Sequence, residues 1–226
     1  MGGAIGEILT PAIGVALSPI PIVAVILMLF SAKAKSNGPA FVGGWIAGIL
    51  IIEGLVLIFA DPANVSGEDG GPSTTASVIQ LGLGILLLLL AAKQWKERPK
   101  GDAEPVMPKW MATIDKTTPI VAVGLGAFLS GVNPKNLIFN LSAGTSIVSS
   151  DASTGGQIAT VLIYTLLASL SVGVPVVWYL LAPESAGKSL EKMRVWLVHN
   201  NAIVMAVLFL VLGISIVGKG ITGLSS

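Results

Sequence analysis

Residues 17–21, LSPIP, and residues 43–51, GGWIAGILI, have counterparts 112 residues later in the chain. The counterparts are LSGVNP at residues 129–134 and GGQIATVLI at residues 155–163. Aligned without a gap, the two 35-residue stretches agree at 11 positions, which indicates an internal duplication. Each copy interrupts an apolar stretch with proline. Repeats with a broken helix at corresponding positions are the best sequence pointer to the substrate site of a transporter.

The composition is that of a membrane protein. Of the 226 residues, 53% are hydrophobic and 11% are charged, and the mean hydropathy is +0.86. Soluble domains carry about 25% charged residues. The absence of cysteine excludes disulfides, thiol-redox carriers and cysteine-ligated metal sites. The net charge of +1, without a basic patch, gives no reason to expect nucleic acid as a partner.

A spanning helix needs about 20 mostly apolar residues. Six segments of the chain meet this requirement: 5–32, 40–60, 75–95, 119–149, 154–182 and 202–224. The sequence therefore predicts an all-α membrane protein of six transmembrane helices, with the first and fourth broken. It divides into a three-helix repeat at 1–95, a cytoplasmic linker at 96–118 and a second three-helix repeat at 119–226.

The basic residues predict the orientation of the spans, because cytoplasmic loops are enriched in Lys and Arg. Eleven of the thirteen lie in the connections after the first, third and fifth segments. Both termini are therefore expected to be extracytoplasmic. With three spans in each repeat, the second repeat is expected to be inverted relative to the first, as in many secondary transporters.

The prolines predict where the first and fourth helices break. Pro19 and Pro21 follow Ser18 in the first segment, and Pro134 follows Asn133 in the fourth. Since proline suits the first turn of a helix, a half-helix is expected to restart at each site. Helix N-termini favour anions, so an anionic ligand group is expected between the two restarts; two structural kinks are the alternative.

Lys135 is the most informative single residue. It lies near the middle of the fourth segment, where a cation costs about 2.5–3.5 kcal/mol to insert. Two roles are open for it: contact with an anionic ligand, or an ion pair with Glu53 of the second segment. For Glu53 itself, proton coupling and a structural ion pair are both open. The remaining candidates for substrate binding are the polar and proline residues beside the two breaks, namely Ser18, Pro19, Pro21, Ser130, Asn133, Pro134 and Asn136.

No catalytic set is present in the sequence. There is one histidine, there is no acidic pair within the apolar segments, and neither a phosphate-binding loop nor a dinucleotide fingerprint occurs. We therefore expect neither an enzyme nor a cofactor. The clustered carboxylates or histidines of a metal transporter are also missing from the segments.

The run at residues 16–27, ALSPIPIVAVIL, together with NGPAFVGGW at 37–45 and NPKN at 133–136, resembles the glycolipid-addressing protein family. This family includes sulfolipid- and peptidoglycolipid-addressing proteins and belongs to the lysine-exporter superfamily of six-span transporters. The resemblance covers nearly the whole chain. It implies a role in moving cell-envelope glycolipids or peptidoglycolipids across the cytoplasmic membrane, often beside a larger lipid exporter. Glu53 is not part of the motifs that carry the resemblance.

Three functions remain open. The first is a transporter or flippase component for a glycolipid, the second a small-solute exporter such as an amino-acid carrier, and the third a non-transporting scaffold of a larger lipid exporter. An apolar, laterally open groove beside Lys135 would favour the first, a closed water-filled pocket the second, and no cavity the third. Membrane lipids, a glycolipid substrate, a larger exporter and a second copy of the chain are the expected partners.

Overall fold

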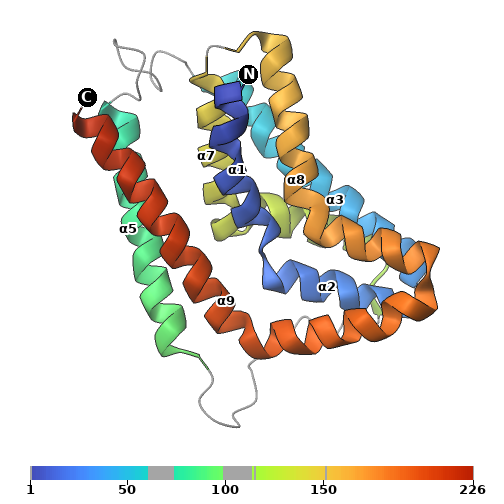
Figure 1. Cartoon of the computed structure of the whole chain (residues 1–226). Helices are drawn as coiled ribbons and strands as arrows, with labels where there is room; N and C mark the ends of the chain where they lie inside the picture. The colour runs from blue at the N-terminus through green and yellow to red at the C-terminus, as the bar shows by residue number, and fades with distance from the viewer. Residues whose placement is uncertain (1, 61–73, 99–113, 115, 151, 226) are drawn as a thin grey trace.

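The computed structural model is helical throughout the part of the chain that it describes, which comprises residues 2–60, 74–98, 114, 116–150 and 152–225 (Figure 1). Its helices are α1 (Gly2–Ala16), α2 (Pro19–Leu29), α3 (Ala34–Phe59), α5 (Thr74–Lys96), α6 (Pro119–Ala127), the π-helical turn η2 (Phe128–Val132), α7 (Pro134–Val148), α8 (Thr154–Leu181) and α9 (Pro183–Ser225). The all-α prediction is confirmed for these residues. The predicted linker at 96–118 falls mostly outside them.

The first break is where the prolines predicted it. Helix α1 ends at Ala16, Ser18 takes an extended conformation with φ −109° and ψ 96°, and α2 begins at Pro19. The two helices meet at an angle of 55°. Proline is tolerated in a first turn because the N–H it lacks has no partner there.

The second break is built differently. Helix α6 passes directly into η2, whose wider turn ends at Val132. Asn133 then leaves the helical conformation, with ψ 123°, and α7 begins at Pro134. The Asn133 Oδ1 atom accepts a hydrogen bond from the backbone N–H of Lys135 at 3.1 Å and so caps α7.

Four helices are long and apolar enough to cross a membrane: α3, α5 from Ser77, α8 and α9. The bent pair α1–α2 is a fifth candidate. The predicted fourth span, 119–149, is divided between the short apolar stretch Pro119–Val132 and α7, which carries Lys135 and several polar residues. The six-span count and the inverted repeat stay predictions.

Helix α9 differs from the sequence expectation. The sequence predicted a loop containing Lys188, Lys192 and Arg194 before a span at 202–224, but α9 is continuous from Pro183 to Ser225. The intervening residues are mostly strong helix formers, and Arg194 pairs with Glu191 one turn earlier. Figure 1 shows α9 changing direction along its length.

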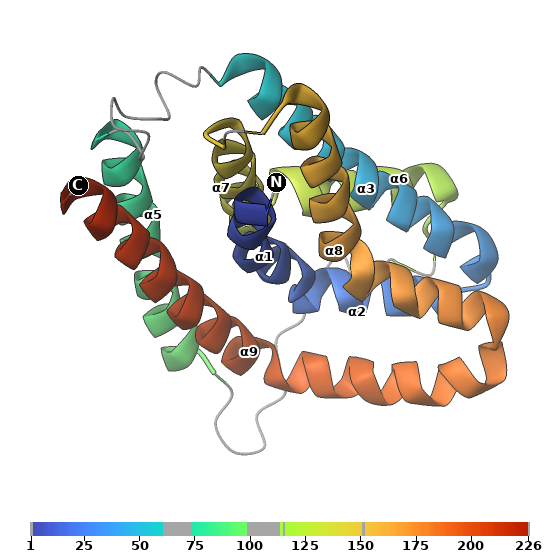
Figure 2. The ribbon, with the colours of Figure 1, turned by 45° about the horizontal axis from the view of Figure 1, so that its top comes forward.

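Close helix packing positions the two breaks. A side chain at Gly44 of α3 would lie 2.0 Å from the carbonyl oxygen of Val123, and one at Gly48 would lie 2.1 Å from Ser130 Oγ. Glycine therefore allows α3 to pack directly against α6 and η2, as expected for membrane helices. Helix α5 packs mainly on α9, and Figure 2 shows this pair set apart from the group formed by α1, α3, α7 and α8.

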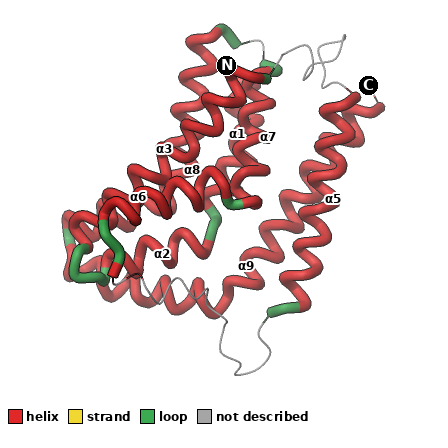
Figure 3. Tube along the Cα trace, turned by 180° about the vertical axis from the view of Figure 1, so that it is seen from behind, coloured by secondary structure: helices red, strands yellow, loops and turns green. Residues whose placement is uncertain are grey.

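Helix α1 begins and α9 ends at the same end of the molecule, as Figures 1 and 3 show from opposite sides. This arrangement agrees with the expectation that both termini lie on one side of the membrane. Which side that is remains a prediction from the distribution of basic residues.

Candidate functional site

The two breaks are joined by the ammonium group of Lys135. Its Nζ atom donates to the carbonyl oxygen of Gly14 at 2.7 Å, to Ser18 Oγ at 2.5 Å and, over a longer 3.4 Å, to the carbonyl oxygen of Leu17. The carbonyl groups at the end of α1 lack helical partners and carry partial negative charge. Lys135 of α7 therefore supplies hydrogen-bond donors to carbonyl groups at the C-terminal end of α1.

Asn136 makes the second connection. The distance from Ser18 Oγ to Asn136 Oδ1 is 3.1 Å, and Asn136 Nδ2 donates to the carbonyl oxygen of Leu129 in η2 at 2.8 Å. Ser18 Oγ also lies 2.7 Å from the carbonyl oxygen of Val15. Since a hydroxyl group has one proton, Ser18 donates to only one of these two acceptors at a time.

A further set of polar contacts joins the second break to α8. The Tyr164 hydroxyl of α8 donates to Asn140 Oδ1 at 2.8 Å, and Asn140 Nδ2 donates to the carbonyl oxygen of Ser130 at 2.9 Å. All three residues are completely buried. These contacts tie η2, α7 and α8 together.

The structure thus brings Ser18, Lys135 and Asn136 into contact, with Asn133 and Ser130 beside them in the turns of the second break. Pro19 and Pro134 are the first residues of α2 and α7. Pro21 is buried in the first turn of α2.

The expected anion site at the helix starts has few donors. Pro19, Pro21 and Pro134 have no N–H group, and the N–H of Lys135 is already bonded to Asn133. Every proton of the Lys135 ammonium group also has a protein acceptor. In this conformation the polar centre between the breaks is closed, and an anionic ligand would have to displace the contacts with α1.

Glu53 is not part of this centre. Its side chain is fully buried on α3 and lies against Gly144 of α7, where a Cβ atom would lie 2.9 Å from Glu53 Oε2. The ion pair with Lys135 is absent; the salt bridges among the described residues are Lys93–Glu97 and Glu191–Arg194. Neither oxygen of the Glu53 carboxyl has a hydrogen-bond partner in the described structure.

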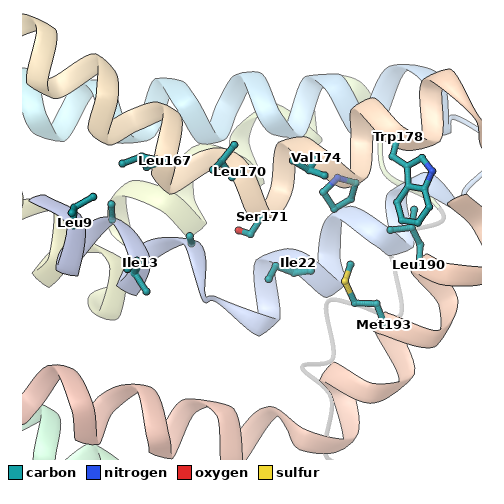
Figure 4. Close-up of a pocket in the computed structure, with 13 residues that line it drawn as sticks. Leu9, Ile13, Ile22, Leu167, Leu170, Ser171, Val174, Trp178, Leu190 and Met193 are labelled. Atoms are coloured by element: carbon teal, nitrogen blue, oxygen red, sulfur yellow. The ribbon is translucent and has the colours of Figure 1, made fainter. Parts of the chain in front are cut away.

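An apolar groove lies beside the first break (Figure 4). Its volume is about 620 Å³, within the range of about 300–1,000 Å³ typical of ligand pockets. It is lined by one face of α1, by Ile22 at the start of α2, by a long stripe of α8 and by the beginning of α9. The lining residues are Leu9, Ala12, Ile13, Ala16, Ile22, Leu167, Leu170, Ser171, Val174, Pro175, Trp178, Leu190 and Met193.

The groove opens to the molecular surface. Ile13 is 54% exposed and Val174 is 55% exposed, although both are large apolar residues. The Ser171 hydroxyl is the polar exception among these side chains, apart from the indole N–H of Trp178. It is shielded from solvent and has no hydrogen-bond partner within the described residues. The groove and the Lys135 centre share the last turns of α1, where Ile13 and Ala16 line the groove and Gly14 and Leu17 accept from Lys135.

Sequence reasoning missed the groove and the Tyr164 contact. The groove residues of α8 have helical spacing, at positions 167, 170, 171, 174, 175 and 178. A helix face that contacts lipid has the same spacing, so the pattern does not identify a groove. Tyr164 is a polar aromatic near the middle of an apolar helix, and this signal was available in the sequence. Gly14 contributes only its carbonyl oxygen, which no side-chain pattern marks.

The arrangement combines an apolar groove with a polar centre at a helix break. No group of three or more His, Cys, Asp or Glu residues that could hold a metal ion occurs among the described residues. The polar centre provides a positive charge at a helix break, and the groove next to it provides an apolar surface open to the side.

The comparison with protein-family models agrees with this geometry. The model described as Sap, sulfolipid-1-addressing protein, matches residues 8–222 and so covers nearly the whole chain. The chain has no significant match among curated proteins or among solved structures. The chain belongs to the sulfolipid-1-addressing protein family.

Proposed function

We propose that this protein is a transporter or flippase component that holds an acyl chain of a cell-envelope glycolipid in the groove between α1, α2, α8 and α9. The observation that carries the proposal is the groove itself: it is apolar, open to the side and adjacent to a buried lysine at a helix break. The name of the family, which refers to addressing a sulfolipid, supports a lipid as the cargo.

The groove favours a lipid over a small polar solute. An amino-acid carrier needs a polar, enclosed pocket around its substrate, whereas the lining here is apolar and open. An acyl chain gains little hydrophobic free energy on leaving the bilayer for an apolar groove, because both are apolar. Shape and a small number of polar contacts therefore decide binding.

The breaks are the proposed points of movement. A buried ammonium group that is released from the carbonyl groups of α1 needs another acceptor, because leaving a buried charge unpaired is costly. The sulfate or phosphate of a lipid headgroup supplies such an acceptor. In the proposed cycle, the headgroup replaces Gly14 and Leu17 as the partner of Lys135 while the chain lies in the groove.

The inverted repeat fits this proposal. Helix α1 packs on α8 and the α6–η2 stretch packs on α3, and these pairs exchange if the first repeat is exchanged with the second. We propose that the two repeats rock against one another around the breaks, the usual movement of such transporters.

Groove-filling variants test the proposal. Val174 of the groove and Val121 of α6 are matched, at 55% and 56% exposed, and both face outward. In vesicles containing a fluorescent glycolipid, Val174→Trp should slow lipid movement about tenfold, equivalent to about 1.4 kcal/mol. Val121→Trp should move lipid at the wild-type rate. Equal rates for wild type and Val174→Trp would contradict the proposal.

The same assay separates the scaffold alternative. A non-transporting partner of a larger exporter would move no lipid when it is the only protein in the vesicle, whether or not the groove is filled. Lipid movement by the purified chain alone, sensitive to Val174→Trp, would exclude that alternative.

A further inference from the structure

The buried carboxyl group of Glu53 has no role in the lipid groove. Glu53 is fully buried, and both of its oxygens lack a hydrogen-bond partner in the described structure. Buried charges in proteins are paired, because an isolated carboxylate in apolar surroundings costs several kcal/mol. The Glu53 carboxyl has neither a cation nor a hydrogen-bond donor in this conformation, so only its neutral, protonated form is compatible with the site.

The surroundings of Glu53 offer no compensating charge. Helix α3 packs against α2, α6, η2, α7 and α8. The first three contain no ionisable side chain, α7 contains Lys135 alone, and α8 contains Tyr164 and Tyr179. Lys35 is the other charged residue of α3, and it lies 18 residues away, about 27 Å along the helix.

Lys135 is directed elsewhere. Its ammonium group bonds to the end of α1, while Glu53 faces Gly144, nine residues and about 14 Å further along α7. The Tyr164 hydroxyl is near enough to interact electrostatically with Glu53, but it donates its hydrogen bond to Asn140 Oδ1. The Tyr164 hydroxyl is therefore not available to donate a hydrogen bond to a negative charge on Glu53.

The carboxyl group of Glu53 lies against α7, the helix that follows the second break, so a movement of α7 would change how well the carboxyl is shielded from water. Its carboxyl group and Val56 press against Gly144, where no side chain separates α3 from α7. If α7 pivots at Asn133, the carboxyl is uncovered and reaches water. The O–H bond of the carboxyl then breaks, the proton goes to water, and the carboxylate remains; closing α7 again requires the reverse step.

We infer that Glu53 is a proton-binding site. Its carboxyl group is protonated when α7 lies against α3 and deprotonated when α7 moves away, and this change couples lipid movement to proton transfer. The coupling rests on the proposed transport function, whereas the proton site does not. The two parts are therefore tested separately.

Infrared spectroscopy of the purified full-length protein tests the proton site. At neutral pH the carbonyl stretch of a protonated carboxyl should be present in wild type, absent in Glu53→Gln and retained in Glu53→Asp. The matched control is Glu7→Gln, since Glu7 is an exposed carboxylate of α1, and it should keep the band. A wild-type protein without the band, or a Glu53→Gln protein that keeps it, overturns the proton site.

Vesicles with an imposed pH gradient test the coupling. The gradient should accelerate glycolipid movement several-fold in wild type and in Glu7→Gln, and should have no effect in Glu53→Gln. A Glu53→Gln protein that responds to the gradient as wild type does overturns the coupling. If no variant moves lipid at all, the proposed function fails, while the infrared result still decides the proton site.

Discussion

The two helix breaks lie at matching positions of the predicted repeat, yet they have opposite chemical roles. The first break exposes the carbonyl oxygens of Gly14 and Leu17 at the end of α1, and thus supplies acceptors. The second break supplies the donor that bonds to them, the ammonium group of Lys135, which also donates to Ser18. Duplicated segments can therefore become complementary partners: one break is held closed by the side chains that the other provides.

The breaks also differ in how they are supported. Ser18 precedes α2 without a capping hydrogen bond from its side chain, whereas Asn133 caps α7. The second break is backed by α3 through Gly48 and by α8 through Tyr164 and Asn140. In this conformation the second break therefore has more contacts with neighbouring helices than the first, which depends on Lys135.

The largest effect is expected from Lys135→Met. The change removes the donor shared by Gly14, Leu17 and Ser18, and each unsatisfied buried acceptor costs about 1–3 kcal/mol. We expect a loss of about 3 kcal/mol in the free energy of unfolding, measured by denaturant titration in detergent. Lys219→Met, at an exposed position of α9, is the control and should change little. Equal stability of the two variants would mean that Lys135 does not hold the first break.

A smaller loss is expected from Gly48→Ala. The new Cβ atom would lie 2.1 Å from Ser130 Oγ and 2.6 Å from the carbonyl oxygen of Ala127, so η2 has to shift. Overpacking of this kind costs about 1–3 kcal/mol. Gly43→Ala is the matched control, since nothing lies within 4 Å of its Cβ position, and the melting temperature should be unchanged or higher. A harmless Gly48→Ala would show that α3 does not support the second break.

Asn133→Ala tests the difference in capping. Loss of the bond to the Lys135 N–H should lower stability by about 1 kcal/mol. Hydrogen exchange of the first turn of α7 should increase, while exchange in the first turn of α2 should not. An equal increase at both helix starts would contradict the asymmetry between the breaks.

A similarly small effect is expected from Tyr164→Phe. The change removes one neutral hydrogen bond and leaves the buried Asn140 Oδ1 without this donor, so it should cost about 1 kcal/mol, the low end for an unsatisfied neutral acceptor. Thermal melting in detergent measures it. Tyr179→Phe, elsewhere on α8, serves as the comparison, and a loss of the same size there would show that the Asn140 contact has no special effect.

The sequence predicted those features that leave a residue signature. Pro19 and Pro134 mark both breaks because proline removes a donor. The partner of Lys135 was not predicted, because a backbone carbonyl oxygen such as that of Gly14 has no side-chain signature. Glu53 was the obvious ionic partner by charge, but it faces Gly144 instead.

The groove could not be predicted for a different reason. In a membrane protein, Leu170 or Val174 is apolar whether it faces lipid, another helix or a groove. Only the path of the helices distinguishes these cases. The charged residues at the start of α9 misled the prediction in the opposite direction, because Lys, Glu and Arg are good helix formers and need not mark a loop.

The most direct test of the account is to locate a bound lipid. A glycolipid with a photoactivatable group on its acyl chain would be incorporated into vesicles with the full-length protein, and the labelled residues would be identified by mass spectrometry. We predict adducts concentrated on the lining residues of α1 and α8, such as Ile13, Leu170 and Val174, and lost in Val174→Trp. Labelling spread evenly over outward-facing residues such as Ile58 and Ile120, and unchanged in Val174→Trp, would contradict the groove as the lipid site.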